Sequence, residues 1–312
     1  MTKMLIEGRL ANKPESNDGR YERLESPFRH RIEPRADARF PAEHGRYHLY
    51  ISTACPWCHR ATLVRALKGL GDAITTTEMA VVMGEASWAI DPERFDPGAG
   101  VPQDRFMHEV YVRADPRYTG PITVPVLWDK RDGTIVSNES ADIMRMLGSA
   151  FEGVEGNDLD LYPEPLRGEI DSWNEFVHER INSGVYRAGF AGTQSAYDEA
   201  ALAVFEALET LESHLASRSH LVGDRLTEPD LRLYTTLVRF DAAYATHFKL
   251  DRARIVDYPN LQTLLESVHV LPGVAATMDT QRMRAHYFLS HPALNPTGIV
   301  SLGPAPLPAI GD

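Results

Sequence analysis

The chain has 312 residues, of which 43% are hydrophobic and 24% are charged, as is usual for a globular protein with one large or two smaller domains. Its net charge of −12 opposes contact with a phosphate backbone, so nucleic acid is not an expected partner. No apolar run approaches the roughly 20 residues of a membrane-spanning helix, and residues 1–12 lack the apolar core of a secretory signal. With only two cysteines, too few for a disulfide scaffold, we expect a cytoplasmic protein without a membrane partner.

The chain opens with a segment that has no sustained hydrophobic period. Residues 1–45 are rich in Arg, Glu, Pro and Gly. We predict an irregular N-terminal extension there, either packed over the following domain or partly disordered.

An α/β pattern follows over residues 46–150. The run Tyr47–Ser52 predicts a buried strand, the run His59–Leu70 predicts a helix, and Ile74–Val82 predicts a second strand. The polar stretch Met83–Asp104 is too long for a simple turn, and loops of this length are often functional. This half of the pattern predicts a strand, a helix, a strand and a long connection.

The pattern then changes to a hairpin and a helix. Asp132-Gly133 stands between the apolar runs 124–128 and 134–136, which is a strong hairpin signal. Asn138 is placed to cap a helix that runs from Glu139 to about Leu147. Together the predicted elements form an α/β sheet domain of about one hundred residues.

Beyond an acidic linker at 153–160, the hydrophobic period is helical almost throughout. Apolar residues step by three and four in several segments, which predicts an all-helical domain over residues 160–290. Thr227-Glu228-Pro229-Asp230 matches a capping box with Asp in the usual place of Glu. The Pro- and Gly-containing residues 291–312 predict an irregular C-terminal tail.

The two cysteines, Cys55 and Cys58, stand three residues apart at the start of the first predicted helix. Pro56 suits the first helical position because its missing N–H is not needed there. At a helix N-terminus the pKa of the first thiol falls from about 8.5 to between about 3.5 and 7.5, so Cys55 is a candidate nucleophile. Cys58 is a possible resolving thiol. A zinc half-site lacks a second Cys pair, and a pair of inert buried cysteines is the other alternative.

Two further features are candidates for the walls of a site. A cis bond at Val124-Pro125 would turn the Val124 backbone towards the thiol to pair with a peptide-like ligand. The local sequence alone favours a plain edge-strand proline. Glu139 and Ser140 open a helix whose N–H groups and hydroxyl can bind a carboxylate, and Glu139 can bind an ammonium group. Taken alone, this pair is only a capped helix.

Several stretches together carry a family resemblance. T-A-C-P-W-C-H-R, T-V-P-V-L-W-D and S-N-E-S-A-D-I resemble a glutathione transferase with a thioredoxin-like α/β first domain and an all-α second domain. N-S-G-V-Y-R-A-G-F-A, L-T-E-P-D-L-R-L-Y-T-T-L-V-R-F-D and N-P-T-G-I-V resemble the glutathionyl-hydroquinone reductases, or Xi-class glutathione transferases. The likeness extends from about Tyr47 to about Gly303.

The resemblance implies a role for each matching position. Cys55 matches the family's catalytic cysteine. The positions that match glutathione-binding residues are Trp88, Arg113, Val124, Glu139 and Ser140, and those that match tyrosines of the aromatic substrate pocket are Tyr186, Tyr244 and Tyr287. The implied co-substrate is glutathione, the implied substrate is an aromatic quinone derivative, no metal is expected, and the implied assembly is a homodimer.

Two positions depart from the family pattern. The family usually has Ala where this chain has Cys58, and Trp88 follows Ala86-Ser87 where the family usually has Gly. The expected activity is reduction of a glutathionyl-hydroquinone through a Cys55–glutathione mixed disulfide. The alternatives are a glutaredoxin-like dithiol or dehydroascorbate reductase that uses Cys55 and Cys58, and a glutathione-fold binding protein without turnover.

Overall fold

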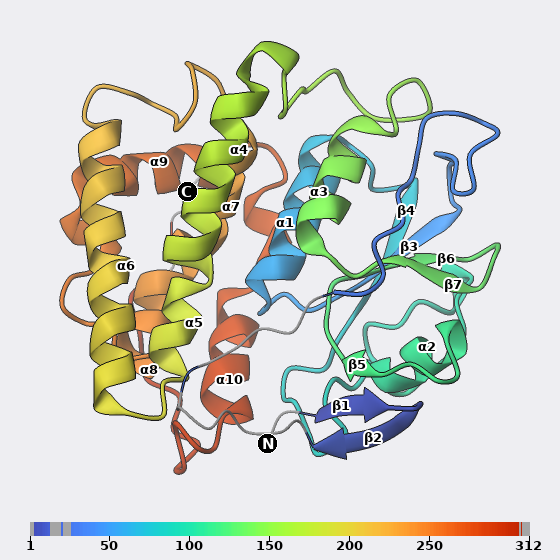
Figure 1. Ribbon diagram of the computed structural model, residues 1–312, viewed down its shortest axis with the longest axis horizontal. Helices are drawn as coiled ribbons and strands as arrows, with labels where there is room; N and C mark the ends of the chain where they lie inside the picture. Colours follow the sequence, from blue (N-terminus) through green and yellow to red (C-terminus); the bar gives the residue numbers. More distant parts are fainter. Residues whose placement is uncertain (1–2, 13–19, 21–25, 306, 308–312) are drawn as a thin grey trace. The chain divides into compact units, whose positions relative to one another are not determined.

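The computed structural model describes residues 3–12, 20, 26–305 and 307. The remaining parts of the predicted N-terminal extension and C-terminal tail lie outside the described residues. The chain divides into two compact units (Figure 1). The first comprises 1–14, 24–159 and 277–290, and the second comprises 15–23, 160–276 and 291–312.

A four-stranded sheet forms the centre of the first unit, in the order β4-β3-β6-β7. Strands β3 (Tyr47–Ile51) and β4 (Ile74–Glu78) are parallel, and β6 (Val126–Asp129) is antiparallel to both β3 and β7 (Thr134–Ser137). The predicted hairpin at Asp132-Gly133 is confirmed. β4 ends four residues earlier than the predicted strand Ile74–Val82.

The described residues of this unit include four α-helices. Helices α1 (Pro56–Leu67) and α3 (Ser140–Ser149) pack against each other (Figure 1). The ring of Tyr47 meets Phe151, just after α3, at 6.2 Å. Because side chains alternate along a strand, the neighbouring His48 and Tyr50 point to the opposite face of the sheet. The other helices are α2 (Met107–Ala114) and α10 (Thr280–Ser290).

The N-terminal residues are more regular than their composition indicated. β1 (Lys3–Ile6) and β2 (Arg9–Asn12) form an antiparallel hairpin, and β1 also pairs with β5 (Gly120–Pro121). Gly8, in the turn, has a φ of +72°, and a Cβ there would lie 2.1 Å from the Pro116 carbonyl oxygen. These strands are too short to show a period of two, so the sequence alone did not reveal them.

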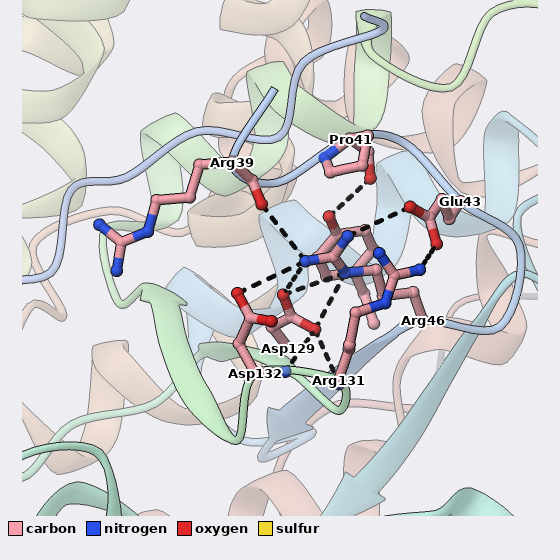
Figure 2. A network of polar contacts seen from close by, with 8 residues as sticks. Arg39, Pro41, Glu43, Arg46, Asp129, Arg131 and Asp132 are labelled. Atoms are coloured by element: carbon pink, nitrogen blue, oxygen red, sulfur yellow. Dashed lines mark hydrogen bonds and ion pairs between the residues drawn. The ribbon is translucent and has the colours of Figure 1, made fainter. Parts of the chain in front are cut away.

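A buried ion pair joins the sheet to the segment before it (Figure 2). Arg46, directly before β3, donates to Asp129 at the end of β6, and their side chains are 4% and 0% exposed. Glu43 also accepts from Arg46 and forms an ion pair with Arg131. The network fixes the end of the β6–β7 hairpin against β3.

The second unit is helical, as predicted. Its helices are α4 (Arg167–Phe176), α5 (Gly184–Gly189), α6 (Gln194–Leu215), α7 (Glu228–Arg239), α8 (Ala245–His247) and α9 (Pro259–His269). Two π-helical segments, Val177–Asn182 and Phe240–Tyr244, join α4 to α5 and α7 to α8. The predicted capping box at Thr227 and Asp230 is confirmed at the start of α7.

Two local expectations differ from the structure. Glu139, not Asn138, is the N-cap of α3. The Asn138 side chain instead donates to the Tyr111 hydroxyl and accepts the Phe28 N–H. Helix α2 was not expected after the long connection. Its buried residues Met107, Val110 and Tyr111 have helical spacing but span scarcely more than one turn.

One helix that was predicted to lie in the helical domain belongs to the first unit. Residues 277–290, expected within the helical domain, belong to the first unit. Arg282 of α10 donates to Asp91 at 2.8 Å and lies 3.4 Å from Glu78. The Nδ1 atom of His286 donates to the Val81 carbonyl at 2.7 Å. These contacts attach α10 to the end of β4 and to the connection that follows.

Candidate active site

Cys55 is the N-cap of α1, and Pro56 is the first helical residue, as predicted. The backbone N–H of Cys58 donates to the Cys55 sulfur at 3.5 Å. This N–H is one of the groups that a helix start leaves without an intrahelical acceptor, and it favours negative charge on the sulfur. Cys55 is 9% exposed, so the sulfur lies at the edge of the core.

The Val124–Pro125 peptide bond is cis, although the local sequence alone favoured a plain edge-strand proline. Pro125 directly precedes β6, so its missing N–H removes no ladder bond from that strand. The carbonyl oxygen of Val124 lies 3.6 Å from the Cys55 sulfur and accepts from the thiol. The structure therefore brings Val124 to the predicted nucleophile.

Glu139 and Ser140 form the start of α3. The Glu139 carboxylate accepts the Ala141 N–H at 3.1 Å, and the Ser140 hydroxyl is buried. Arg60 of α1 donates to this hydroxyl at 3.2 Å, and its guanidinium lies 4.5 Å from the Trp57 ring centroid. Arg60 thus links the helix that carries the thiol to the start of α3.

Arg60 was not among the residues predicted for the site. It is 1% exposed although it carries a charge, and buried arginines are found where they are paired. Arg60 stands within the stretch T-A-C-P-W-C-H-R, one turn after Trp57. Its i, i+3 spacing from an aromatic residue was the available signal, but the Ser140 partner was not predictable locally.

Two residues that were predicted to bind glutathione, Trp88 and Arg113, contact other side chains of the first unit. The Trp88 ring stacks on His286 of α10 at 5.1 Å and 4°, and its carbonyl accepts the Met107 N–H. Arg113 of α2 is 45% exposed and forms an ion pair with Asp104 at 2.5 Å. The hydrogen bond to Asp104 raises the pKa of Arg113. No described contact brings Arg113 to Cys55, Val124 or Glu139.

Tyr287 is the predicted substrate tyrosine that lies in the first unit. Its hydroxyl donates to the carbonyl of Ala54 at 3.5 Å, directly before Cys55 in the chain. The contact depends on α10, which Arg282 and His286 attach to the same unit. A residue more than 200 positions away in sequence thus adjoins the thiol segment.

Tyr186 and Tyr244 lie together in the second unit. Their rings meet at 6.0 Å and 63°, and Phe248 stacks on Tyr244 at 5.2 Å and 1°. A Cβ on Gly189 would lie 2.2 Å from Phe248, so the close approach of α5 requires glycine there. Tyr244 ends one π-helical segment and Tyr186 follows the other. Such segments occur frequently at functional sites.

Among the described residues, no group of three or more His, Cys, Asp or Glu side chains is arranged to hold a metal ion. Within the same residues, no helix combines the length and the apolar character that crossing a membrane requires.

Comparisons with known proteins agree with this geometry. Residues 54–150 match the glutathione S-transferase N-terminal domain, and residues 194–267 match the C-terminal domain. The chain is 48% identical to the glutathionyl-hydroquinone reductase PcpF of Sphingobium chlorophenolicum, over 95% of this chain and 93% of that protein. It is 46% identical to the glutathionyl-hydroquinone reductase YqjG of Escherichia coli, over 93% and 90%.

Solved structures agree as well. The glutathione-bound structure of YqjG superimposes with a TM-score of 0.86 at 43% identity, covering 97% of this chain and 96% of that one. The Xi glutathione S-transferase of Phanerochaete chrysosporium superimposes with a TM-score of 0.89 at 42% identity, covering 95% and 97%. The chain therefore belongs to the glutathionyl-hydroquinone reductase family, the Xi class of glutathione transferases.

Proposed function

We propose that this protein is an enzyme that reduces glutathionyl-hydroquinones to hydroquinones with glutathione as the reductant. The observation that carries the proposal is the position of the Cys55 sulfur at the start of α1, where it accepts the Cys58 N–H. Relatives of this chain are named for the same activity, and one of them was solved with glutathione bound.

In the first half-reaction, the Cys55 thiolate attacks the glutathione sulfur of the substrate. A bond forms between the two sulfurs, and the bond between sulfur and the aromatic carbon breaks. The aromatic carbon keeps the electron pair and takes a proton from a tyrosine hydroxyl or from water. Hydroquinone leaves, and Cys55 remains joined to glutathione as a mixed disulfide.

In the second half-reaction, the thiolate of a second glutathione attacks the sulfur of the bound glutathione. Oxidised glutathione leaves, and the Cys55 thiolate is regenerated. The start of α1 assists this step because the Cys58 N–H stabilises the leaving thiolate of Cys55. Over both steps, one substrate and one glutathione give one hydroquinone and one oxidised glutathione.

Glutathione has a peptide backbone, carboxylates and an ammonium group, and the site offers partners for each. We propose that the Val124 backbone pairs with the peptide, that the start of α3 at Ser140 binds a carboxylate, and that Glu139 binds the ammonium group. Trp88 and Arg113 stay predictions from the family pattern. Roles for Tyr186, Tyr244 and Tyr287 in binding the aromatic substrate likewise stay predictions from the family pattern.

The proposal is tested by mixing the protein with a glutathionyl-hydroquinone and measuring the hydroquinone released, while the mass of the intact protein is followed in parallel. We expect release of hydroquinone into solution, steady turnover when glutathione is added, and neither result with Cys55→Ser. Hydroquinone production by Cys55→Ser at the wild-type rate would overturn the assignment of the nucleophile. Glutathione binding without hydroquinone release by the wild type would instead favour the binding protein without turnover.

The assembly and location of the protein stay predictions. We propose a homodimer, from the family resemblance, and a cytoplasmic location, where glutathione keeps thiols reduced. Sedimentation of the purified protein checks the first. Fractionation of the cells that make the protein checks the second.

A further inference from the structure

We infer that Cys58 is a second reacting thiol, which displaces glutathione from Cys55 and closes an internal Cys55–Cys58 disulfide. This inference deepens the proposed function and rests on its mixed-disulfide intermediate. It makes the resting state of the enzyme respond to the ratio of reduced to oxidised glutathione.

The first support is the proximity of the two residues. The Cys58 backbone nitrogen lies 3.5 Å from the Cys55 sulfur, and the Cys58 sulfur is only three bonds from that nitrogen. Cys55 is the N-cap and Cys58 the third helical residue, which is the Cys-x-x-Cys arrangement from which thiol–disulfide oxidoreductases form a disulfide. The spacing of the two cysteines therefore suits closure of a disulfide.

The second support is a polar contact to the Cys58 sulfur. The backbone N–H of Ser52, just after β3, donates to this sulfur at 3.4 Å. A thiolate on Cys58 would be stabilised by the same N–H, since hydrogen bonds to a charged acceptor are stronger than those to a neutral one. An alanine at this position would offer the Ser52 N–H no such acceptor.

The third support is the difference in exposure between the two sulfur-bearing residues. Cys55 is 9% exposed and Cys58 is 1% exposed, so a glutathione in solution reaches Cys55 from outside while Cys58 adjoins it from within the fold. Thiol–disulfide exchange requires the attacking and leaving sulfurs to lie on opposite sides of the attacked sulfur. We therefore expect the more deeply buried Cys58 to attack from the side opposite a glutathione that arrives from solution.

The step balances without an additional oxidant. The Cys58 thiolate attacks the Cys55 sulfur of the mixed disulfide, the new disulfide forms, and glutathione leaves as a thiolate that takes up the proton lost by Cys58. One glutathione then reopens the internal disulfide by forming the mixed disulfide again, and a second releases oxidised glutathione. When reduced glutathione is scarce, the enzyme accumulates as the internal disulfide.

Oxidised glutathione is the probe for this inference because it loads Cys55 without any hydroquinone chemistry. The reduced full-length protein is mixed with it, and intact mass and released glutathione are followed. We expect the wild type to lose two hydrogens in mass and to carry little adduct. We expect Cys58→Ala to stop as a stable adduct of one glutathione, and Cys55→Ser to form neither species.

The outcomes separate the two proposals. A wild type that keeps the glutathione adduct as long as Cys58→Ala does would overturn the inference, whether or not hydroquinone is released in the activity assay. An internal disulfide in a protein that releases no hydroquinone would support the inference and overturn the proposed substrate. Cys58→Ser, with far-UV circular dichroism on each variant, guards against a folding defect in the alanine variant.

Discussion

Glu139 caps α3, and we propose that the same carboxylate binds the ammonium group of glutathione. One oxygen, Oε1, accepts the Ala141 N–H and caps α3, and the negative charge of the carboxylate is what the proposed function uses to bind an ammonium group. Replacement by glutamine keeps an oxygen for the cap but removes the charge. The two roles are therefore separable by a single substitution.

We expect Glu139→Gln to raise KM for glutathione about tenfold to a hundredfold, because a hydrogen bond to a charged group contributes about 1.5–3 kcal/mol. The maximal rate should change much less, since the reacting sulfurs are untouched. Steady-state kinetics with glutathione varied will measure both quantities.

Glu109→Gln is the matched control for this prediction. Glu109 accepts the N–H groups of Arg105 and Phe106 at the start of α2, so it is a capping carboxylate in the same unit. Its replacement should leave KM for glutathione unchanged. An equal rise of KM in both variants would mean that helix capping, and not ammonium binding, explains the effect.

Among single residues, those that the sequence identified as candidates have a signal in the residues next to them. Cys55 was predictable from its spacing to Cys58 and from Pro56, and Glu139 and Ser140 from their place before a helical period. The contact of Tyr287 with Ala54 and the pairing of Arg60 with Ser140 join residues far apart in sequence. Only the packing of helices sets such contacts, so no local pattern predicts them.

The buried ion pair in Figure 2 determines how the β6–β7 hairpin meets β3. Asp129 accepts from Arg46 and also from the N–H groups of Arg131 and Asp132 in the turn. Burial makes the pair sensitive to loss of one member, because the remaining charge is left without its partner inside the protein.

We expect Asp129→Ala to lower the free energy of unfolding by about 3–5 kcal/mol, the range found when one member of a buried ion pair is removed. Urea denaturation followed by circular dichroism will measure the loss. Glu33→Ala is the control, because its partner Arg35 is 63% exposed and such pairs contribute about 1 kcal/mol or less. Equal losses in the two variants would contradict the role given to burial.

The capping box of α7 is a second buried polar element. Asp230 accepts the N–H groups of Leu221 and Thr227, each at 2.8 Å, and Asp230 is 0% exposed. Burial raises the pKa of this carboxyl group. Its removal leaves two backbone donors inside the protein without an acceptor.

We expect Asp230→Ala to lower the free energy of unfolding by at least about 2 kcal/mol, since each buried donor left without a partner costs about 1–3 kcal/mol. Thr193→Ala is the control, because this N-cap of α6 makes one exposed bond to the Ala196 N–H and should contribute about 1 kcal/mol. Thermal or urea denaturation of both variants tests the difference, and a smaller effect at Asp230 would argue against it.

Helices and strands whose ends carry a capping or turn motif were predictable, and the shortest ones were not. Pro56 and the Thr227 capping box located the starts of α1 and α7, and Asp132-Gly133 located the hairpin. The cap of α3 shifted by one residue, because Tyr111 occupies the Asn138 side chain through a tertiary contact. Helix α2 and the strands β1 and β2 are too short for their periods to stand out.

For the whole chain, the change from α/β to helical periodicity predicted the two folds, which the family matches bear out. It did not predict that α10 returns to the first unit. A helical period shows that one face will be buried but does not identify the surface that buries it. In α10 the partner is fixed by Arg282, whose acceptor Asp91 precedes it by 191 residues.

Each unit contains a histidine that burial keeps neutral. Burial lowers the pKa of His48 in the first unit to about 3, and burial, with His291 and Lys249 nearby, lowers that of His247 in the second unit to about 4. The unfolded chain binds a proton at each site near pH 6.5, so below that pH it holds more protons than the folded chain. Stability therefore falls as the pH falls from about 6.5 towards 4.

When the pH falls from 7 to 5, we expect the free energy of unfolding to fall by about 2 kcal/mol for each of these histidines. Over that interval the histidine binds a proton in the unfolded chain but not in the folded one. Urea denaturation at several pH values measures the slope, and His48→Gln should flatten it by removing one titrating group while keeping a donor for Thr75. His44→Gln is the control, since that side chain is 61% exposed. If the slope stays as steep with His48→Gln as with His44→Gln, the acid sensitivity does not arise from His48.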